Sequence, residues 1–393
     1  MAGSYIVAGA RTPIGKMSGA LASFSAADLG SIAIKAALER AGVSPNEVDH
    51  VIMGQVLMAG QGQVPSRQAA VKAGIPMSVP AINVNKVCLS GLNAIYLADQ
   101  MIQAGDADIV IAGGMESMTN APYIASGARG GFRYGNTELK DAIIADGLWC
   151  SFDSCLMGLG TERYTAGNIS RQQQDDLAMK SNQRAAAAIA AGRLADEIIA
   201  VSIPQRKGDP LVIANDEGVR AETTMESLGG LKPAFDKDGT ITAANASQLS
   251  DGGSAVVMMS ERFVKDRGIK ALGQVVSYGM VAGPDNASLL TQPSRAILKA
   301  LNKVGMKVSD INLFELNEAF ATVGIASMAD LGISDDIVNV NGGAIALGHP
   351  IGMSGNRVAL TILHELRRRG GGVGAAALCG GGGQGDAIIV RTV

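Results

Sequence analysis

Aromatic side chains and charged residues are both scarce in this chain. Phe, Tyr and Trp make up 4% of the 393 residues and 18% are charged, whereas 47% are hydrophobic and 51 residues are glycine. Such a chain is expected to pack its backbone closely instead of packing around large rings. The net charge is only −3, and the basic residues are scattered without aromatic partners, so nucleic-acid binding is not expected.

Long hydrophobic runs are also missing. The apolar stretch from Ile109 to Gly114 is far shorter than the roughly 20 residues that a membrane-spanning helix needs. The first sixteen residues contain Arg11 and Pro13 in place of a basic start followed by an apolar segment, so no secretory signal is expected. The sequence therefore predicts a cytoplasmic protein with no membrane partner.

The chain has few cysteines and no pair of them with metal-binding spacing. The four are Cys88, Cys150, Cys155 and Cys379, and no Cys-x-x-Cys motif occurs. In a chain of this length without a secretory signal, neither a disulfide framework nor a paired-cysteine metal site is expected. Each cysteine is then either a small buried apolar residue or a reactive thiol.

A duplication runs through the chain, which is longer than the roughly 250–300 residues of one ordinary core. Apolar positions of an expected helix recur 263 positions later: Ala33, Ile34 and Ala37 correspond to Ala296, Ile297 and Ala300. The dipeptide at 90–91 recurs as the Ser-Gly at 354–355, and each opens an apolar helical pattern that leads to a strand. We expect a compact, oligomeric α/β enzyme built from two homologous halves.

The segment between the halves differs from them in amino-acid composition. We expect one half at residues 1–118 plus about 247–272, an insertion at 119–246, and the other half at 273–393. Binding residues often gather on loops carried by a rigid scaffold, so the insertion is interpreted as a substrate-binding lid. A structural or oligomer-forming flap is the alternative.

Cys88 lies in a segment, 83–93, that reads as a short strand, a turn and the start of a helix. Backbone N–H groups and the positive end of the helix dipole favour a thiolate at such a place, and the thiolate is the nucleophilic form of cysteine. Cys88 is therefore a candidate nucleophile. The alternative is a cysteine that simply fills space in the core.

His349, one of only three histidines, lies near the end of the glycine-rich segment 341–352. Flanking glycines allow the backbone to approach another group, and Pro350 fixes the turn that holds the imidazole. A hydrogen-bonded structural histidine is the alternative. Taken alone, the segment does not decide between the two.

Cys379 ends an apolar strand and is followed by four glycines. Bare glycine N–H groups could bind an oxyanion or a phosphate, but no Gly-Lys-Ser/Thr follows, which disfavours a nucleotide P-loop. Asn317 stands at the matching strand end of the second half, where it could orient a water or donate to a carbonyl. Two thiols, one histidine and one asparagine at such positions predict acyl transfer through a thioester.

Four motifs together resemble the thiolase family. They are Asn-x-x-Cys-x-Ser-Gly at 85–91, Asn-Glu-Ala-Phe at 317–320, Gly-His-Pro-x-Gly at 348–352 and Cys-Gly-Gly-Gly-x-Gln-Gly at 379–385. The similarity extends over nearly the whole chain and is greatest to the acetyl-CoA acetyltransferase branch. It implies two similar mixed-sheet halves in a layered α/β/α/β/α arrangement with an inserted loop lobe.

The resemblance also implies roles for the candidate residues. Cys88 would attack the acyl-CoA carbonyl while His349 takes its proton, and Cys379 would act as the acid/base for carbon–carbon bond formation or cleavage. His349, with a water held by Asn317, would form one oxyanion site. The backbone N–H groups of Cys88 and Gly381 would form the other.

Further positions match residues that contact CoA or wall the acyl pocket in the family: Leu148, Met157, Arg220, Ser247 and Phe320. Arg220 would lie near the nucleotide end, or would otherwise be a solvated surface charge. Leu156 departs from family members that carry a histidine before the Met-Gly pair, so one polar contact to the CoA arm is not expected here.

The resemblance implies acetyl-CoA, acetoacetyl-CoA and CoA as substrates and products, a homotetramer built as a dimer of dimers, and no metal or redox cofactor. A broader-chain 3-ketoacyl-CoA thiolase of fatty-acid breakdown is the alternative within the family. A decarboxylating ketoacyl synthase usually has a second histidine where this chain has Cys379. A catalytically idle acyl-CoA carrier would have no reason to keep both thiols and His349.

Overall fold

A large mixed sheet forms the centre of the computed structural model, which describes residues 3–165 and 167–393. A short strand, β2 (Gly15–Lys16), pairs with β12 beside it. In spatial order the other strands are β14 (Leu313–Leu316), β15 (Val373–Gly380), β16 (Gln384–Arg391), β13 (Gly273–Ala282), β1 (Ser4–Arg11), β12 (Ser250–Ser260), β5 (Ile109–Ser117), β3 (His50–Gly54) and β4 (Ala81–Val84).

The sheet consists of two similar parts joined by a short seam. Between β1 and β13 only Tyr5 and Ile6 pair, with Gln274 and Gly273. On either side of the seam the pattern repeats: β1, β12 and β5 are successively antiparallel and β3 is parallel to β5, just as β13, β16 and β15 are antiparallel and β14 is parallel to β15. The predicted duplicated fold is confirmed.

Three helices recur in the same order in the two halves. In the first half they are α1 (Ala26–Ala41), α2 (Pro65–Lys72) and α3 (Ser90–Ala104), and in the second α8 (Gln292–Lys303), α9 (Ala321–Leu331) and α11 (Ser354–Arg368). Ser90 and Ser354 each open a helix, as the repeated dipeptide predicts. The remaining helices outside the insertion are α7 (Glu261–Asp266) and α10 (Ala344–Leu347).

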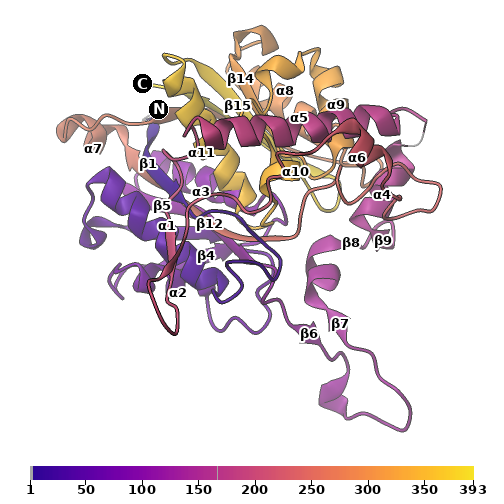
Figure 1. Ribbon diagram of the computed structural model, residues 1–393. Coiled ribbons are helices and arrows are strands. Elements are labelled where there is room, and N and C mark those ends of the chain that lie inside the picture. The colour runs from indigo at the N-terminus through magenta and orange to yellow at the C-terminus, as the bar shows by residue number, and fades with distance from the viewer. Residues whose placement is uncertain (1–2, 166) are drawn as a thin grey trace.

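The layers follow from where the apolar faces point. Leu92 and Ile95 of α3 pack with Val358 and Leu363 of α11 in a core that both halves of the sheet line. Helices α1 and α2 cover the outer face of the first half, and α8 covers that of the second with α9 packed against it (Figure 1). This order is the α/β/α/β/α arrangement that the sequence predicts.

The two central helices cross at their N-termini through glycine. A Cβ atom on Gly91 would lie 2.8 Å from the backbone nitrogen of Asn356, and one on Gly355 would overlap the backbone nitrogen of Leu92. Since real Cβ atoms do not approach so closely, these positions need glycine. The crossing brings the turns that precede α3 and α11 side by side, and those turns carry Cys88 and the segment after His349.

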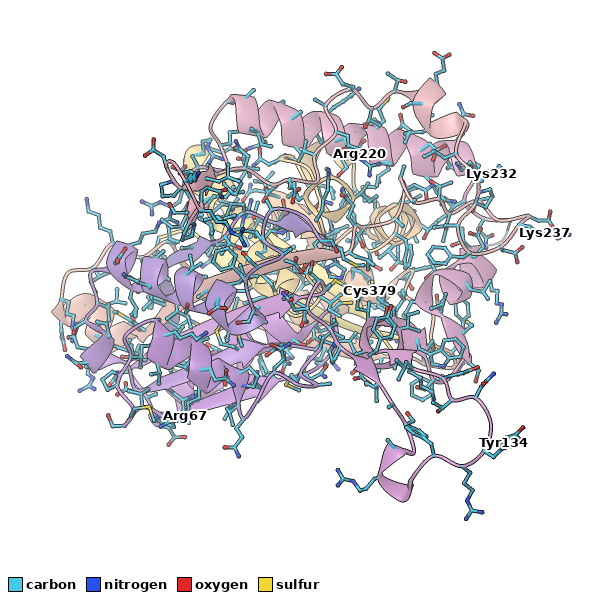
Figure 2. All side chains as sticks on the ribbon, turned by 60° about the horizontal axis from the view of Figure 1, so that its bottom comes forward. Arg67, Tyr134, Arg220, Lys232, Lys237 and Cys379 are labelled. Carbon is cyan, nitrogen blue, oxygen red and sulfur yellow. The ribbon has the colours of Figure 1, made fainter. Side chains whose placement is uncertain are left out.

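The segment between β5 and β12 forms an arm and a helical lobe. Strands β6 (Tyr123–Ile124) and β7 (Lys140–Asp141) carry an arm that projects from the body, with Tyr134 at its end (Figures 1 and 2). Along the chain follow a π-helical turn (Ile143–Leu148), β8 (Trp149–Cys150), β9 (Cys155–Leu156), α4 (Met157–Thr165), α5 (Arg171–Ala190), β10 (Val201–Ile203), β11 (Leu211–Ile213) and α6 (Met225–Gly229). None of the helices in the described ranges is long and apolar enough to cross a membrane.

Candidate active site

Cys88 lies on a tight turn between β4 and α3, two residues before the helix begins. Ser90 shapes the turn: its Oγ accepts a hydrogen bond from the Lys86 N–H at 2.8 Å and donates to the Val87 carbonyl at 2.6 Å. Val87 has a φ of +50°, which is uncommon for a β-branched residue. Such strain is typical of functional sites and presents the next side chain, Cys88, away from the helix.

His349 is buried and its orientation is fixed by hydrogen bonds. Its Nδ1 lies 2.6 Å from the Oγ of Ser354, and that hydroxyl donates its one proton to the Pro350 carbonyl at 3.0 Å. The hydroxyl must therefore accept from Nδ1–H, which leaves Nε2 as the unprotonated nitrogen. The Nδ2 of Asn317 lies 3.5 Å from Nε2. Ser354 is the repeat counterpart of Ser90, but its contact with His349 could not be predicted from that correspondence.

One small cavity of about 50 Å³ brings most of the candidates together. Cys88, His349 and Cys379 all line it, although Cys88 and Cys379 are 291 positions apart in the chain. Its wall also includes Gly381, Leu148, Met157, Ser247 and Phe320. Asn317 adjoins this group through its contact with His349.

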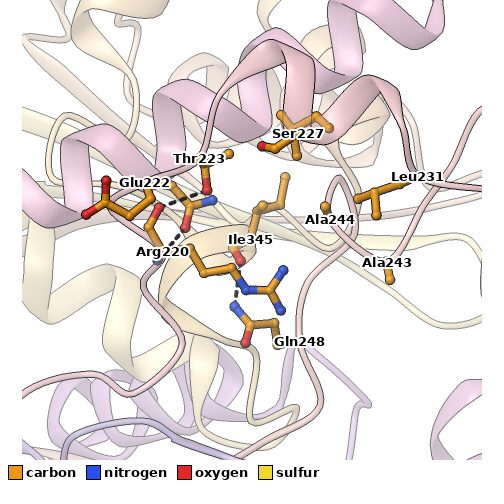
Figure 3. Close-up of a pocket in the computed structure, with 11 residues that line it drawn as sticks. Arg220, Glu222, Thr223, Ser227, Leu231, Ala243, Ala244, Gln248 and Ile345 are labelled. Carbon is orange, nitrogen blue, oxygen red and sulfur yellow. Dashed lines mark hydrogen bonds between the residues drawn. The ribbon is translucent and has the colours of Figure 1, made fainter.

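Arg220 lies apart from the thiols, in a cavity of about 280 Å³. Figure 3 shows its side chain beside Gln248, with Ser227 and Leu231 on the other walls. Its backbone is fixed by Asn182, whose Oδ1 accepts from the Arg220 N–H at 2.9 Å. The guanidinium makes no ion pair with any residue that the structure describes, so it is available to an anionic ligand.

A third cavity, of about 430 Å³, connects the other two. It shares Ala243 and Gln248 with the cavity of Arg220, and it shares Leu148, Phe320 and His349 with the cavity of the thiols. Its wall is mainly apolar and includes Leu156. The three cavities therefore adjoin in a row, called the channel below, and the row suits a long ligand with an anionic end at Arg220 and its other end at Cys88.

Burial sets the protonation states of the three reactive groups. It raises the pKa of Cys88 to about 12, although the backbone N–H groups of Cys88 and Gly381 act in the opposite direction. Burial, and then the neighbouring Cys88, raises the pKa of Cys379. Burial, and then the charge of Arg357, lowers the pKa of His349 to about 3. The stabilised thiolate that the sequence predicts at Cys88 is therefore wrong, because desolvation of the sulfur outweighs the N–H donors.

An ion pair ties the two thiol-bearing segments together. The Nζ of Lys86, two residues before Cys88, lies 2.7 and 3.0 Å from the carboxylate oxygens of Asp386. Asp386 is buried on β16, opposite Leu378 in the ladder, and also accepts a hydrogen bond from the hydroxyl of Tyr278 at 2.7 Å. Since Leu378 precedes Cys379, the pair fixes the Cys88 turn relative to the strand of the other thiol.

Glu116 joins two further loops of the site. Its carboxylate accepts hydrogen bonds from the N–H groups of Val56, Leu57 and Gly352, at 2.9, 3.1 and 3.0 Å. Burial raises its pKa to about 7 against the effect of these donors. Glu116 thereby fixes the loop after β3 to the loop that follows His349.

Comparison with known proteins gives a consistent result over the full chain. Family models described as thiolase, N-terminal domain, and thiolase, C-terminal domain, match residues 4–262 and 269–392. A protein of Mycolicibacterium smegmatis named "Probable acetyl-CoA acetyltransferase" is 55% identical over 98% of this chain and 100% of its own. Proteins named "Acetyl-CoA acetyltransferase" from Cupriavidus necator and Pseudomonas aeruginosa are 50% and 49% identical, each over 98% of both chains.

Proposed function

The chain belongs to the thiolase family, and from this premise we propose that it is an acetyl-CoA C-acetyltransferase. It would condense two acetyl-CoA into acetoacetyl-CoA and CoA, and catalyse the reverse. The observation that carries the proposal is the single cavity that holds both thiols and the neutral imidazole at the end of a long channel. A cytoplasmic location is part of the proposal, because the thiols must stay reduced.

The first step would form an acyl-enzyme. The sulfur of Cys88 attacks the acyl carbonyl, the Nε2 of His349 takes the thiol proton, and that proton leaves with the CoA sulfur. Two neutral groups, a thiol and an imidazole, can begin this exchange without a pre-formed ion pair. The N–H groups of Cys88 and Gly381, which already contact the sulfur, would stabilise charge on the acyl oxygen.

The second step would make the carbon–carbon bond. Cys379 first gives its thiol proton to the Nε2 of His349, which lines the same cavity. The Cys379 thiolate then removes a proton from the methyl group of a second acetyl-CoA, and the carbanion attacks the carbonyl of acyl-Cys88. The C–S bond of acyl-Cys88 breaks, and the released Cys88 sulfur takes the proton back from His349. A thiol of raised pKa gives a strong base once it is ionised, which suits so weak a carbon acid. With that proton on Nε2, His349 would donate to the enolate oxygen; the buried Oδ1 of Asn317 has no partner among the described residues and could orient a water there.

Coenzyme A would occupy the channel. Arg220 would bind the anionic nucleotide end, and the connecting cavity would hold the pantetheine arm beside Leu148, Met157, Ser247 and Phe320. Leu156 lines this cavity with a side chain that cannot hydrogen-bond to the arm.

The function is tested by steady-state thiolysis of 3-ketoacyl-CoA substrates of increasing chain length, followed through loss of enolate absorbance. We expect a sharp preference for the four-carbon substrate, because the cavity between the thiols is small. Equal rates with long chains would support the broader-chain thiolase instead. No CoA-dependent loss with any substrate would support a non-catalytic carrier.

The pKa directions predict a flat pH profile for acylation. A pKa near 3 keeps His349 in its base form, and a pKa near 12 keeps Cys88 protonated, so the thiol–imidazole pair exists at every pH between these values. The rate of acetyl-enzyme formation, measured by rapid quench, should then stay level from about pH 5.5 to about pH 9. A rise centred on the ordinary histidine value of 6.5 would contradict this.

Ser354→Ala should slow acylation by about tenfold, less than the roughly 10²–10⁴ that a whole general base contributes. Without the hydroxyl, Nδ1–H loses its acceptor and the imidazole can turn or change tautomer. The burst of CoA release measures this step. Ser354→Thr keeps a hydroxyl and should recover most of the rate; equal loss in both variants would exclude the positioning role.

We also propose that the insertion at 119–246 serves both CoA binding and assembly of a homotetramer. The arm exposes apolar side chains that a partner subunit would cover, with Tyr123 65%, Phe132 56% and Leu139 60% exposed. Replacing Phe132 and Tyr134 with serine should halve the mass measured by light scattering. Serine at Leu211 and Val212, which are exposed outside the arm, is the matched control and should leave the mass unchanged.

A further inference from the structure

Two cysteines outside the catalytic cavity face each other across a small hairpin. Cys150 of β8 is the direct ladder partner of Cys155 of β9. Directly opposite residues in an antiparallel pair have Cα atoms about 4.5–5.5 Å apart and side chains on the same face. That spacing lies within the roughly 4.4–6.8 Å that a disulfide spans. Both thiols are free, and both are buried.

The two sulfurs have complementary surroundings. The Nη1 of Arg163 lies 3.7 Å from the Sγ of Cys155, whereas the Sγ of Cys150 donates to the Oδ2 of Asp153 at 3.5 Å. A guanidinium thus contacts one sulfur and a carboxylate the other, and the carboxylate oxygen is placed to accept the proton of the Cys150 thiol during exchange. A Cβ on Gly160 of α4 would lie 3.6 Å from the Cys155 sulfur and 3.3 Å from that same Asp153 oxygen, so the Cys155 thiol and the carboxylate that contacts Cys150 both lie against the first turn of α4.

We propose that Cys150 and Cys155 form a reversible dithiol–disulfide couple that is oxidised by low-molecular-weight disulfides. The Cys155 thiolate attacks one sulfur of the small disulfide and releases one thiol. The Cys150 thiol, losing its proton to Asp153, then displaces the second. One protein S–S bond forms, one S–S bond of the small molecule breaks, and two small thiols leave with the two protons. The loop between the cysteines is short, so the bond gains little from chain entropy and is easily reduced again.

The hairpin forms part of the channel wall, which gives the couple a consequence for turnover. Leu148 and Met157 flank the hairpin and line the cavity of the catalytic thiols, and Leu156 lines the connecting cavity. A cross-link at the pair beside the hairpin loop would stiffen this wall and hinder entry of the acyl-CoA arm. This consequence rests on the proposed function, whereas formation of the bond depends on the hairpin alone.

Mass spectrometry tests the bond directly. Trypsin cuts after Lys140 and Arg163, so peptide 141–163 holds both cysteines and no other. After incubation of the whole enzyme with glutathione disulfide and alkylation, this peptide should be two hydrogen atoms lighter and unalkylated, and dithiothreitol should restore both thiols. Cys150→Ala and Cys155→Ala should each leave one alkylated or glutathionylated thiol. A wild-type peptide that stays doubly alkylated, or that is linked to Cys88 or Cys379, would overturn the proposal.

Thiolysis by the same samples tests the consequence. Oxidation should raise the KM for acetoacetyl-CoA several-fold in the wild type and leave the Cys150→Ala/Cys155→Ala protein unchanged. An equal rise in KM in both proteins would assign the effect of oxidation to Cys88. An unchanged KM despite complete disulfide formation would show that the bond does not affect turnover. Either result would overturn the proposed effect on turnover. If the reduced enzyme has no thiolysis activity, the proposed function fails while the disulfide result stands.

Discussion

A Cys88→Ser protein mixed with radiolabelled acetyl-CoA should carry no acetyl label after denaturation. The serine hydroxyl is a far weaker acid than a thiol, and a neutral hydroxyl is a much poorer nucleophile toward a thioester. Loss of the nucleophile in another covalent enzyme costs on the order of 10⁶ in kcat, and we expect a loss of similar size in thiolysis.

Cys150→Ser is the control for this experiment, because it removes a buried thiol that does not line the catalytic cavity. It should take up label as the wild type does under reducing conditions. Normal labelling of the Cys88→Ser protein would exclude Cys88 as the acyl carrier and would remove the basis for the proposed mechanism.

A Cys379→Ala protein should behave differently, because the two thiols would serve different steps. It should still become acetylated on Cys88 and exchange its acetyl group with free CoA. Condensation and thiolysis should fall by at least the roughly 10²–10⁴ that a general acid/base contributes. The small change in volume should leave the wall around Leu289 and Phe320 in place.

Separate assays distinguish the two steps in this variant. Exchange of labelled CoA into acetyl-CoA reports the acylation of Cys88 alone, whereas formation of acetoacetyl-CoA needs both thiols. If exchange and condensation fall by the same factor, then Cys379 supports acylation, and the proposed division of roles is wrong.

The repeat in the sequence predicted the fold because it records two copies of one packing pattern. Ala33 and Ala296 recur at a constant offset since both face the sheet from an outer helix, and each is fully buried. A periodic apolar pattern is a local property, so it is visible without coordinates. The short seam between β1 and β13 could not be predicted, because no local sequence pattern indicates which distant strands pair with each other.

Some features of the site could likewise be predicted from the sequence, and others could not. The motifs around Cys88, His349 and Cys379 stand out in the sequence, because glycine and proline mark the turns that present them. Lys86 and Asp386 stand 300 positions apart, and their pairing exists only because the two halves pack together. The raised pKa of Cys88 could not be predicted either. The helix start that favours a thiolate is visible in the sequence, but the degree of burial that opposes it is not.

The crossing of α3 and α11 has a further consequence for symmetry. Gly91 meets Asn356, and the repeat counterparts Gly355 and Leu92 meet each other, so the contact is reciprocal. Reciprocal contacts are the signature of a two-fold axis, here one that relates two halves of a single chain as if they were subunits of a dimer. The chemistry does not obey this axis: 264 positions after the nucleophile stands Gly352, and 264 positions before the imidazole stands Asn85. A symmetric frame thus holds one asymmetric group of residues, and neither half alone contains all of those that we propose for catalysis.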